Sequence, residues 1–255
     1  GINSGAAMFT AQLWGQEDIP AIRRVLSLTL KLSFLTSLIF FFITQFAPEW
    51  ALGIYSTDPG VIQLGGQYLR IFGWSFLFFG IMYSYAAVVR STGDVRTPLV
   101  VSIGALSFNM LLSYLLIFGH LGLPQLGSLG AAWGTLIARI LECLALVLLV
   151  YKKRSPAAAT PEQLLEFDAA FSWKVLKPVL PVALNEILWS FGITAYNVAY
   201  ARIGTESIAA MNIFSTIDGL AFTLFIGIGN ACAILVGYWI GAGEERQAFR
   251  YALRS

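Results

Sequence analysis

Two carboxylates, Glu186 and Asp218, lie inside long apolar stretches of the sequence. An ionisable side chain within a membrane-spanning segment is costly and is therefore a candidate for a functional role. A carboxylate in a cavity of low dielectric can exchange a proton for another cation, so we interpret both residues as sites for a coupling ion or a cationic substrate. The structural alternative for Glu186 is a carboxylate held by Asn185 or Lys177, and for Asp218 a protonated or paired side chain.

Polar side chains accompany these carboxylates at helical spacing. Ser190 and Asn197 follow Glu186 along one helical face. Asn212 lies on a different face of its segment from Asp218, where it could line a cavity or form interhelical hydrogen bonds. The residues expected to bind the coupling cation or the substrate are Glu186, Asp218, Asn185, Asn212, Ser190 and Asn197.

Four further residues are weaker candidates for the lining of a cavity. Trp189 and Tyr196 lie deep in the segment that contains Glu186, where they could hold an organic cation by cation–π contact or simply pack. Asn109 lies inside another apolar segment. Arg70 could lie at the mouth of a cavity or extend to the membrane interface along its long side chain.

Two other sets of polar residues have a spacing that predicts helical contacts. Ser102, Asn109 and Ser113 share one face of a predicted helix. Arg139 and Glu142 are three residues apart, so we interpret them as an ion pair within a single helix.

The segments that must position these side chains are long and apolar. Apolar residues make up 57% of the 255-residue chain and charged residues only 12%, and the mean hydropathy is +0.73. A run of about 18 or more mainly apolar residues can cross a bilayer, where a helix satisfies its own backbone hydrogen bonds. We expect membrane helices over residues 25–47, 61–89, 98–118, 129–151, 173–201 and 206–240, and the last half of another over residues 1–14.

Proline and glycine residues indicate where some of the expected helices start or are interrupted. Pro178 and Pro181 should interrupt the helix over 173–201. The helix over 206–240 exceeds one bilayer thickness, so we expect it to tilt or to break near Gly227 and Gly229. Thr160 and Pro161 resemble the start of a short helix in the polar segment 152–168.

Basic residues concentrate in alternate connectors. Arg23, Arg90, Lys152 and Arg246 represent the connectors on one side, whereas Arg202 is the only clear basic residue on the other. By the positive-inside rule, the basic connectors lie in the cytoplasm, and the protein crosses the cell (inner or plasma) membrane several times.

Composition and motifs argue against several other classes of protein. The net charge of +2 and the absence of a basic face speak against a nucleic-acid partner. The sequence has no phosphate-binding loop, no Ser/His/Asp set and no metal-ligand pattern, so we expect no enzymatic activity, no cofactor and no metal site. Cys143 and Cys232 lie in apolar segments, as packing residues do. The chain begins without Met and without a signal peptide, and we expect it to be a fragment of a longer protein.

An internal repeat links the two ends of the chain. Residues 1–29 align without gaps with residues 227–255, and five positions are identical in the two copies. Both copies are small-residue helix ends that run into a glycine, acidic residues and then arginines. This spacing predicts a six-helix unit repeated in the same orientation, an arrangement that builds two-lobed transporters.

Several motifs of the chain resemble those of the multidrug and toxic compound extrusion (MATE) family. They follow the family's order and cover essentially the whole chain, from late helix two to the end of helix eight. A gapless match places Trp189, one turn beyond Glu186, where cation-coupled members carry their helix-seven acid. The matching motifs are TAQLWGQED (10–18), RSTGDVRTP (90–98), LGSLGAAWGTLIAR (126–139), LPVALNE (180–186), RIGTESIAA (202–210) and LVGYWIGAG (235–243).

The resemblance implies an all-α, polytopic membrane protein with two lobes in a 6+6 arrangement, of which this partial chain holds about seven helices. Residues 1–151 would form the N-terminal lobe (helices 2–6), 152–168 a cytoplasmic inter-lobe linker, and 169–255 the start of the C-terminal lobe (helices 7–8).

The resemblance also implies a function. The protein would be a secondary active antiporter that exports cationic or amphipathic drugs and toxic compounds in exchange for Na⁺ or H⁺ by alternating access. Its partners would be membrane lipid and small organic cations, and the full-length chain would act as a monomer.

Two alternatives remain open. One is a lipid-linked oligosaccharide flippase of the same superfamily, whose cavity should be strongly cationic. Here only Lys31, Arg70 and Arg139 could supply that charge. The other is a non-transporting membrane scaffold or receptor subunit.

Overall fold

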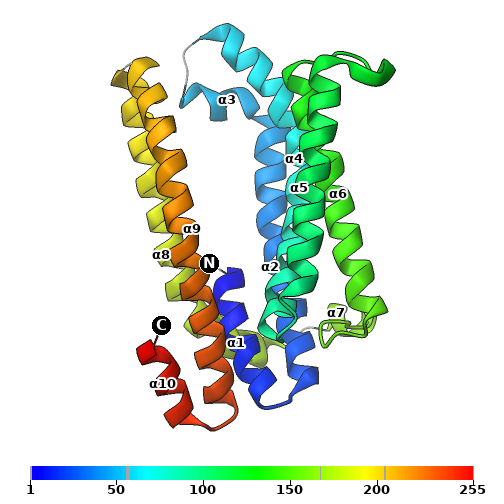
Figure 1. The fold of residues 1–255 in the computed structure, drawn as a ribbon, viewed down its shortest axis with the longest axis vertical. Helices are drawn as coiled ribbons and strands as arrows, with labels where there is room; N and C mark the ends of the chain where they lie inside the picture. The colour runs from blue at the N-terminus through cyan, green and yellow to red at the C-terminus, as the bar shows by residue number, and fades with distance from the viewer. Residues whose placement is uncertain (1, 56–57, 167, 204, 255) are drawn as a thin grey trace. The chain divides into compact units, whose positions relative to one another are not determined.

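The computed structural model describes residues 2–55, 58–166, 168–203 and 205–254, and these residues form helices and short connectors (Figure 1). Six helices of the described part are long and apolar enough to cross a membrane, as expected, and α1, with 14 residues, is shorter than a full span. The helices are α1 (Ile2–Gly15), α2 (Ile19–Phe46), α3 (Pro48–Gly53), α4 (Pro59–Ser91), α5 (Arg96–Phe118), the 3₁₀ helix η1 (His120–Gly122), α6 (Ser128–Lys152), α7 (Pro161–Leu165), α8 (Ala169–Ile203), α9 (Thr205–Gly241) and α10 (Glu245–Arg254).

The chain divides into two compact units. The first comprises Gly1–Val25 and Leu165–Ser255, and the second comprises Leu26–Leu164. In the first unit, α9 contacts α1, α8 and α10, and α1 also contacts α8. In the second unit, α6 contacts both α4 and α5, and α3 contacts α4. Each candidate side chain is therefore positioned by helix–helix contacts within its own unit.

Small and hydroxyl-bearing residues bring α2 and α4 together in the second unit. A Cβ atom on Gly73 would collide with the side chain of Thr44. The Ser84 hydroxyl lies 3.0 Å from both Ser33 Oγ and the Gly80 carbonyl oxygen. Membrane helices pack through such small residues, because lipid tails are as apolar as the helices and only close backbone approach favours association.

The two interruptions predicted from Pro and Gly are not found. The helix α8 continues through Pro178 and Pro181, and α9 continues through Gly227 and Gly229. Proline is tolerated in membrane helices because neighbouring groups satisfy the freed backbone atoms. A glycine costs only about 1 kcal/mol relative to alanine within a helix, so two of them need not break a long apolar one.

The polar segment after α6 is held by hydrogen bonds and burial within the second unit. The Tyr151 hydroxyl donates to the Ala159 carbonyl oxygen at 2.6 Å, and Ala159 is buried. The predicted start of a helix at Thr160 is confirmed, because the Thr160 and Gln163 side chains each accept a hydrogen bond from the other residue's backbone N–H, at 3.4 and 3.0 Å. The segment is fixed as far as Leu164, whose carbonyl oxygen accepts from Ser27 Oγ at 2.7 Å.

Candidate functional site

The main set of candidate side chains lies on α8. Asn185, Glu186, Ser190 and Asn197 are all exposed within the chain. Polar side chains in membrane-spanning helices almost always face the interior of a bundle or a water-filled cavity. We therefore expect this face of α8 to meet water, ligand or another helix.

The aromatic candidates lie on the same helix. Trp189 is 61% exposed and Tyr196 is 66% exposed, so neither ring is covered by the rest of the chain. Open aromatic faces beside a carboxylate can hold an organic cation through the ring quadrupole and the negative charge together.

The second carboxylate belongs to α9, which packs against α8 within the first unit. Asp218 is half-buried. Thr223, one turn and a half further along α9, donates from Oγ1 to the Gly219 carbonyl oxygen at 2.6 Å, so this hydroxyl is satisfied by its own helix. The side chains of Glu206 and Asn212 on α9, and that of Arg202 on α8, are not among those that the structure describes.

Asn109, a weaker candidate, takes part in a polar contact between α5 and α6 in the second unit. Its Nδ2 lies 3.4 Å from Thr135 Oγ1, and its Oδ1 accepts from Ser113 Oγ at 2.9 Å. Thr135 Oγ1 in turn donates to the Ala131 carbonyl oxygen at 2.9 Å. The predicted shared face of α5 is therefore the face that packs on α6.

A buried carboxylate lies further along the same helix pair. Glu142 is 3% exposed, and its two oxygens accept from Ser102 Oγ at 2.8 Å and from Arg139 Nη1 at 2.6 Å. The Arg139 guanidinium also lies over the ring of Phe79 on α4, 5.3 Å from its centroid. The predicted pairing of Arg139 with Glu142 is confirmed. Sequence reasoning missed that Ser102 completes it, because a shared face on α5 does not reveal which helix covers that face.

Arg70, the last weaker candidate, forms an ion pair that joins α4 to α3. Its Nη2 lies 2.9 Å from Glu49 Oε1 on α3, and the two side chains are 53% and 50% exposed. Gln45 Nε2 donates to the Arg70 carbonyl oxygen at 2.7 Å, which ties the end of α2 to the same place.

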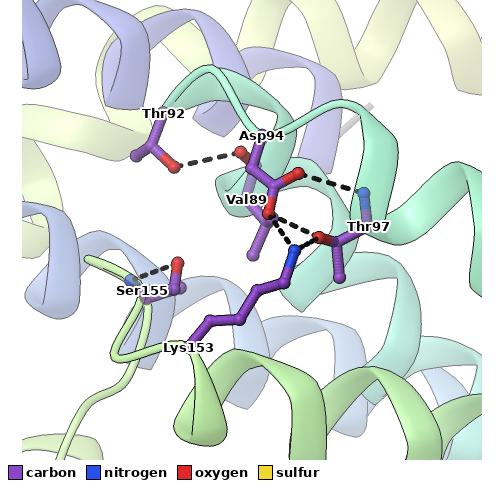
Figure 2. A network of polar contacts seen from close by, with 7 residues as sticks. Val89, Thr92, Asp94, Thr97, Lys153 and Ser155 are labelled. Carbon is purple, nitrogen blue, oxygen red and sulfur yellow. Dashed lines mark hydrogen bonds and ion pairs between the residues drawn. The ribbon is translucent and has the colours of Figure 1, made fainter.

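The connector between α4 and α5 forms a polar network with the end of α6 (Figure 2). Asp94 Oδ1 accepts from the Thr97 backbone N–H at 3.0 Å, while its Oδ2 accepts from the Thr97 hydroxyl and from Lys153 Nζ. Lys153 Nζ also donates to Thr97 Oγ1 at 2.6 Å. The hydrogen bond from the Thr97 side chain, with help from Lys153, lowers the pKa of Asp94 below its ordinary value.

The described residues contain no group of three or more His, Cys, Asp or Glu side chains that could hold a metal ion. Cys143 is buried and Cys232 is partly buried.

Long apolar helices with polar and acidic side chains inside them define a polytopic helical membrane protein. The MatE family model matches residues 1–115 and 181–255. The chain belongs to this family, the MATE transporters.

Curated relatives agree with the assignment. The chain is 27% identical over 246 residues to the "Probable multidrug resistance protein YoeA" of Bacillus subtilis (strain 168), covering 96% of this chain and 53% of that protein. It is 31% identical over 205 residues to the "Multidrug resistance protein NorM" of Burkholderia vietnamiensis, covering 77% of this chain and 42% of that one. The chain thus spans about half the length of the curated relatives that it matches.

Solved structures show the same fold. A crystal structure of MATE in the bent conformation matches with a TM-score of 0.81 at 16% identity, covering 100% of this chain and 56% of that one. An outward-facing multidrug resistance MATE family transporter of the MOP superfamily matches with a TM-score of 0.79 at 16% identity, with the same coverage.

Proposed function

We propose that this chain is the central part of a secondary antiporter, which exports cationic or amphipathic compounds in exchange for Na⁺ or H⁺ by alternating access. The observation that carries the proposal is the pair of carboxylates, Glu186 and Asp218, on two apolar helices that pack against each other. A charged side chain at the centre of a membrane-spanning helix costs about 2.5–3.5 kcal/mol, so carboxylates on two neighbouring helices favour a functional role for them.

The residues beside Glu186 suit this role. Asn185, Ser190 and Asn197 supply amide and hydroxyl groups, which coordinate small cations and satisfy a carboxylate in either protonation state. Trp189 and Tyr196 add exposed rings for an organic cation. Na⁺ or H⁺ and the exported compound would compete for the same negative charge, which is the simplest way to couple their movements.

Coupling requires that each ligand prefer one of two states. A ligand that binds both conformations equally shifts nothing, so the coupling ion must bind the carboxylates more tightly in one conformation than in the other. We propose that residues 1–151 and 169–255 belong to the two lobes that move, with 152–168 between them. We also propose that the connectors containing Arg23, Arg90, Lys152 and Arg246 face the cytoplasm.

The pairing of two cations argues against the alternative of a flippase for lipid-linked oligosaccharides. Such a protein should present a strong positive charge to a pyrophosphate group. Of the three candidate cations inside the second unit, Arg70 is paired with Glu49 and Arg139 with Glu142. Each pair is close to neutral, so little positive charge is left for an anionic ligand.

The test is ethidium efflux from cells that express the full gene product, with Na⁺ and pH gradients imposed separately. Antiport predicts efflux under one of the two gradients, and that gradient identifies the coupling ion. An absence of efflux under both, with the protein shown to reside in the membrane, would contradict the proposal and favour the flippase.

A further inference from the structure

The ion pair between Arg139 and Glu142 is buried, unlike an exposed pair such as Lys153 with Asp94. The side chains of that exposed pair are 52% and 34% exposed, whereas Glu142 is 3% exposed. Taking two charges out of water costs about as much as their attraction returns, so a buried ion pair is weak evidence for a role in stability alone. The surroundings of the pair therefore bear on what else it does.

Three helices of the second unit supply those surroundings. The helix α6, which carries both charges, packs on α4 and on α5 (Figure 1). Each carboxylate oxygen of Glu142 has one described partner, Ser102 Oγ at 2.8 Å and Arg139 Nη1 at 2.6 Å. The guanidinium carbon of Arg139 lies 5.3 Å from the centroid of the Phe79 ring. A carboxylate and an aromatic ring thus contact one guanidinium, and a hydroxyl holds the carboxylate in place.

This combination of groups suits an organic cation. An aromatic face attracts a cation within about 6 Å of its centroid, and a carboxylate neutralises the charge. Arg139 is itself a cation of this kind, because its guanidinium is planar, delocalised and weakly hydrated. The second unit therefore contains the elements of a cation site that is occupied by a side chain of the same protein.

The aromatic side of this cluster is accessible within the described chain. The Phe79 ring stacks on Tyr83, with centroids 5.6 Å apart and an interplanar angle of 23°. Both residues are 40% exposed, and the Arg139 side chain is 27% exposed. The guanidinium of Arg90 lies over the Tyr83 ring, 5.7 Å from its centroid. Ring surface is therefore open beside the Arg139 guanidinium, while the carboxylate of Glu142 stays covered.

Exchange of one cation for another would avoid the main cost of opening the pair. Withdrawal of Arg139 alone would leave the buried Glu142 carboxylate without its counter-ion, which is strongly unfavourable. An incoming organic cation would keep the carboxylate paired throughout. The long stem of arginine lets its guanidinium move while the backbone of α6 stays in place.

We infer that Phe79, Ser102 and Glu142 form a binding site for organic cations in the second unit, and that Arg139 is a resident competitor for it. A ligand cation takes the place of the guanidinium on the ring and the carboxylate, and the return of the guanidinium helps to release the ligand. The class of ligand rests on the proposed export of organic cations. The existence of a cation site at Glu142 does not rest on antiport.

The direct test is ethidium binding to the purified full gene product without any ion gradient, followed by ethidium fluorescence. A background of Glu186→Gln with Asp218→Asn removes the carboxylates of the first unit from the measurement. In that background, Arg139→Met should bind ethidium about tenfold tighter, as expected for a site that its competitor leaves free about one-tenth of the time. Adding Glu142→Gln should abolish this binding. Binding no tighter in Arg139→Met, or unchanged by Glu142→Gln, would overturn the inference.

Efflux separates a competitor from a purely structural residue. With Glu186 and Asp218 intact, Arg139→Met should bind ethidium more tightly and yet lose efflux, because the group that displaces the ligand is gone. A purely structural role predicts that binding and efflux weaken together. Lys153→Met is the matched control, because it breaks an exposed ion pair and should change neither. A parent without efflux under either gradient would count against antiport and leave the binding test valid.

An aromatic variant tests the site with the ion pair left intact. Phe79→Leu keeps an apolar side chain but removes the aromatic face, so ethidium binding in the background above should weaken about fivefold. Phe76→Leu, one turn away on α4, is the control, because the described contacts of its ring are with Phe40 and Phe72. Equal binding by the two variants would remove Phe79 from the site.

Restoring the missing cation gives a second, independent readout. Arg139→Ala removes the guanidinium, and ethylguanidinium chloride added to the solution resembles the lost group. A ligand that binds only the folded protein raises its Tm. Ethylguanidinium should therefore raise the Tm of Arg139→Ala and leave that of Arg139→Ala with Glu142→Gln unchanged. A Tm that does not rise in Arg139→Ala, or that rises equally in both variants, would contradict a cation site at Glu142.

Discussion

Removal of Arg139 from its pair with Glu142 should destabilise the second unit far more than removal of an exposed pair of similar geometry. Arg139→Met would leave Glu142, which is 3% exposed, with Ser102 as the remaining partner described for its carboxylate. Loss of one partner from a buried ion pair typically costs about 3–5 kcal/mol. The Arg139 side chain is itself 27% exposed, which reduces the expected loss to about 2–3 kcal/mol.

The assay is thermal unfolding of the purified full gene product, followed by tryptophan fluorescence. A loss of 2–3 kcal/mol corresponds to a fall in Tm of about 4–12 °C for a unit of 150–250 residues. The matched control is Arg70→Met, which breaks the Arg70–Glu49 pair at 2.9 Å, where both side chains are about half exposed. Exposed pairs contribute at most about 1 kcal/mol, so this control should lower Tm by no more than about 4 °C.

A double variant completes the test. Arg139→Met with Glu142→Met replaces both charges by apolar groups of similar size, and such replacements are often neutral or stabilising. We therefore expect the double variant to be more stable than Arg139→Met alone. A double variant that loses the sum of the two single losses would refute the reasoning, because additivity means that the two side chains do not interact.

The remaining predictions concern the connector, the helix packing and the carboxylates. Asp94→Ala should cost about 1 kcal/mol, because it removes the acceptor for the Thr97 backbone N–H at the start of α5. Because the pKa of Asp94 is lowered in the folded protein, the carboxylate's contribution is present above about pH 4 and is lost as the pH falls below that. Unfolding curves of parent and variant across pH measure this, and a Tm difference that vanished between pH 7 and pH 5 would contradict it. Gly73→Ala should lower stability by about 1–3 kcal/mol through collision with α2, whereas Gly104→Ala, with nothing within 4 Å, should not; equal Tm values for the two variants would argue against close packing. Glu186→Gln and Asp218→Asn should each abolish ion-driven ethidium efflux at unchanged membrane expression, and retained efflux in either would remove that residue from the mechanism.

The long helices could be predicted because the bilayer constrains both their length and their apolar composition. A segment that crosses the bilayer must be apolar over its full length and must be helical. The span predicted at 98–118 is accordingly observed as Arg96–Phe118, and the span predicted at 129–151 as Ser128–Lys152. The helix ends shifted by a few residues because caps such as Asp58, which accepts from the Gly60 N–H, lie outside the apolar run.

The contacts between helices could not be predicted in the same way. Membrane helices are apolar on every side, so their periodicity does not say which face meets which neighbour. The pairing of Arg139 with Glu142 was predictable because it lies within one helix, but the bond from Ser102 to Glu142 joins residues 40 positions apart. Gly15 and Gly241 were visible as repeated residues, yet only the structure shows that they press against each other's helices.

The central claim is tested most directly by measuring both fluxes at once. The full gene product would be reconstituted into liposomes with a fluorescent reporter of internal pH or Na⁺, and ethidium would be added to one side. Antiport predicts that ethidium entry drives the coupling ion in the opposite direction, and that Glu186→Gln abolishes both movements. Ethidium movement with no flux of either ion would contradict the account.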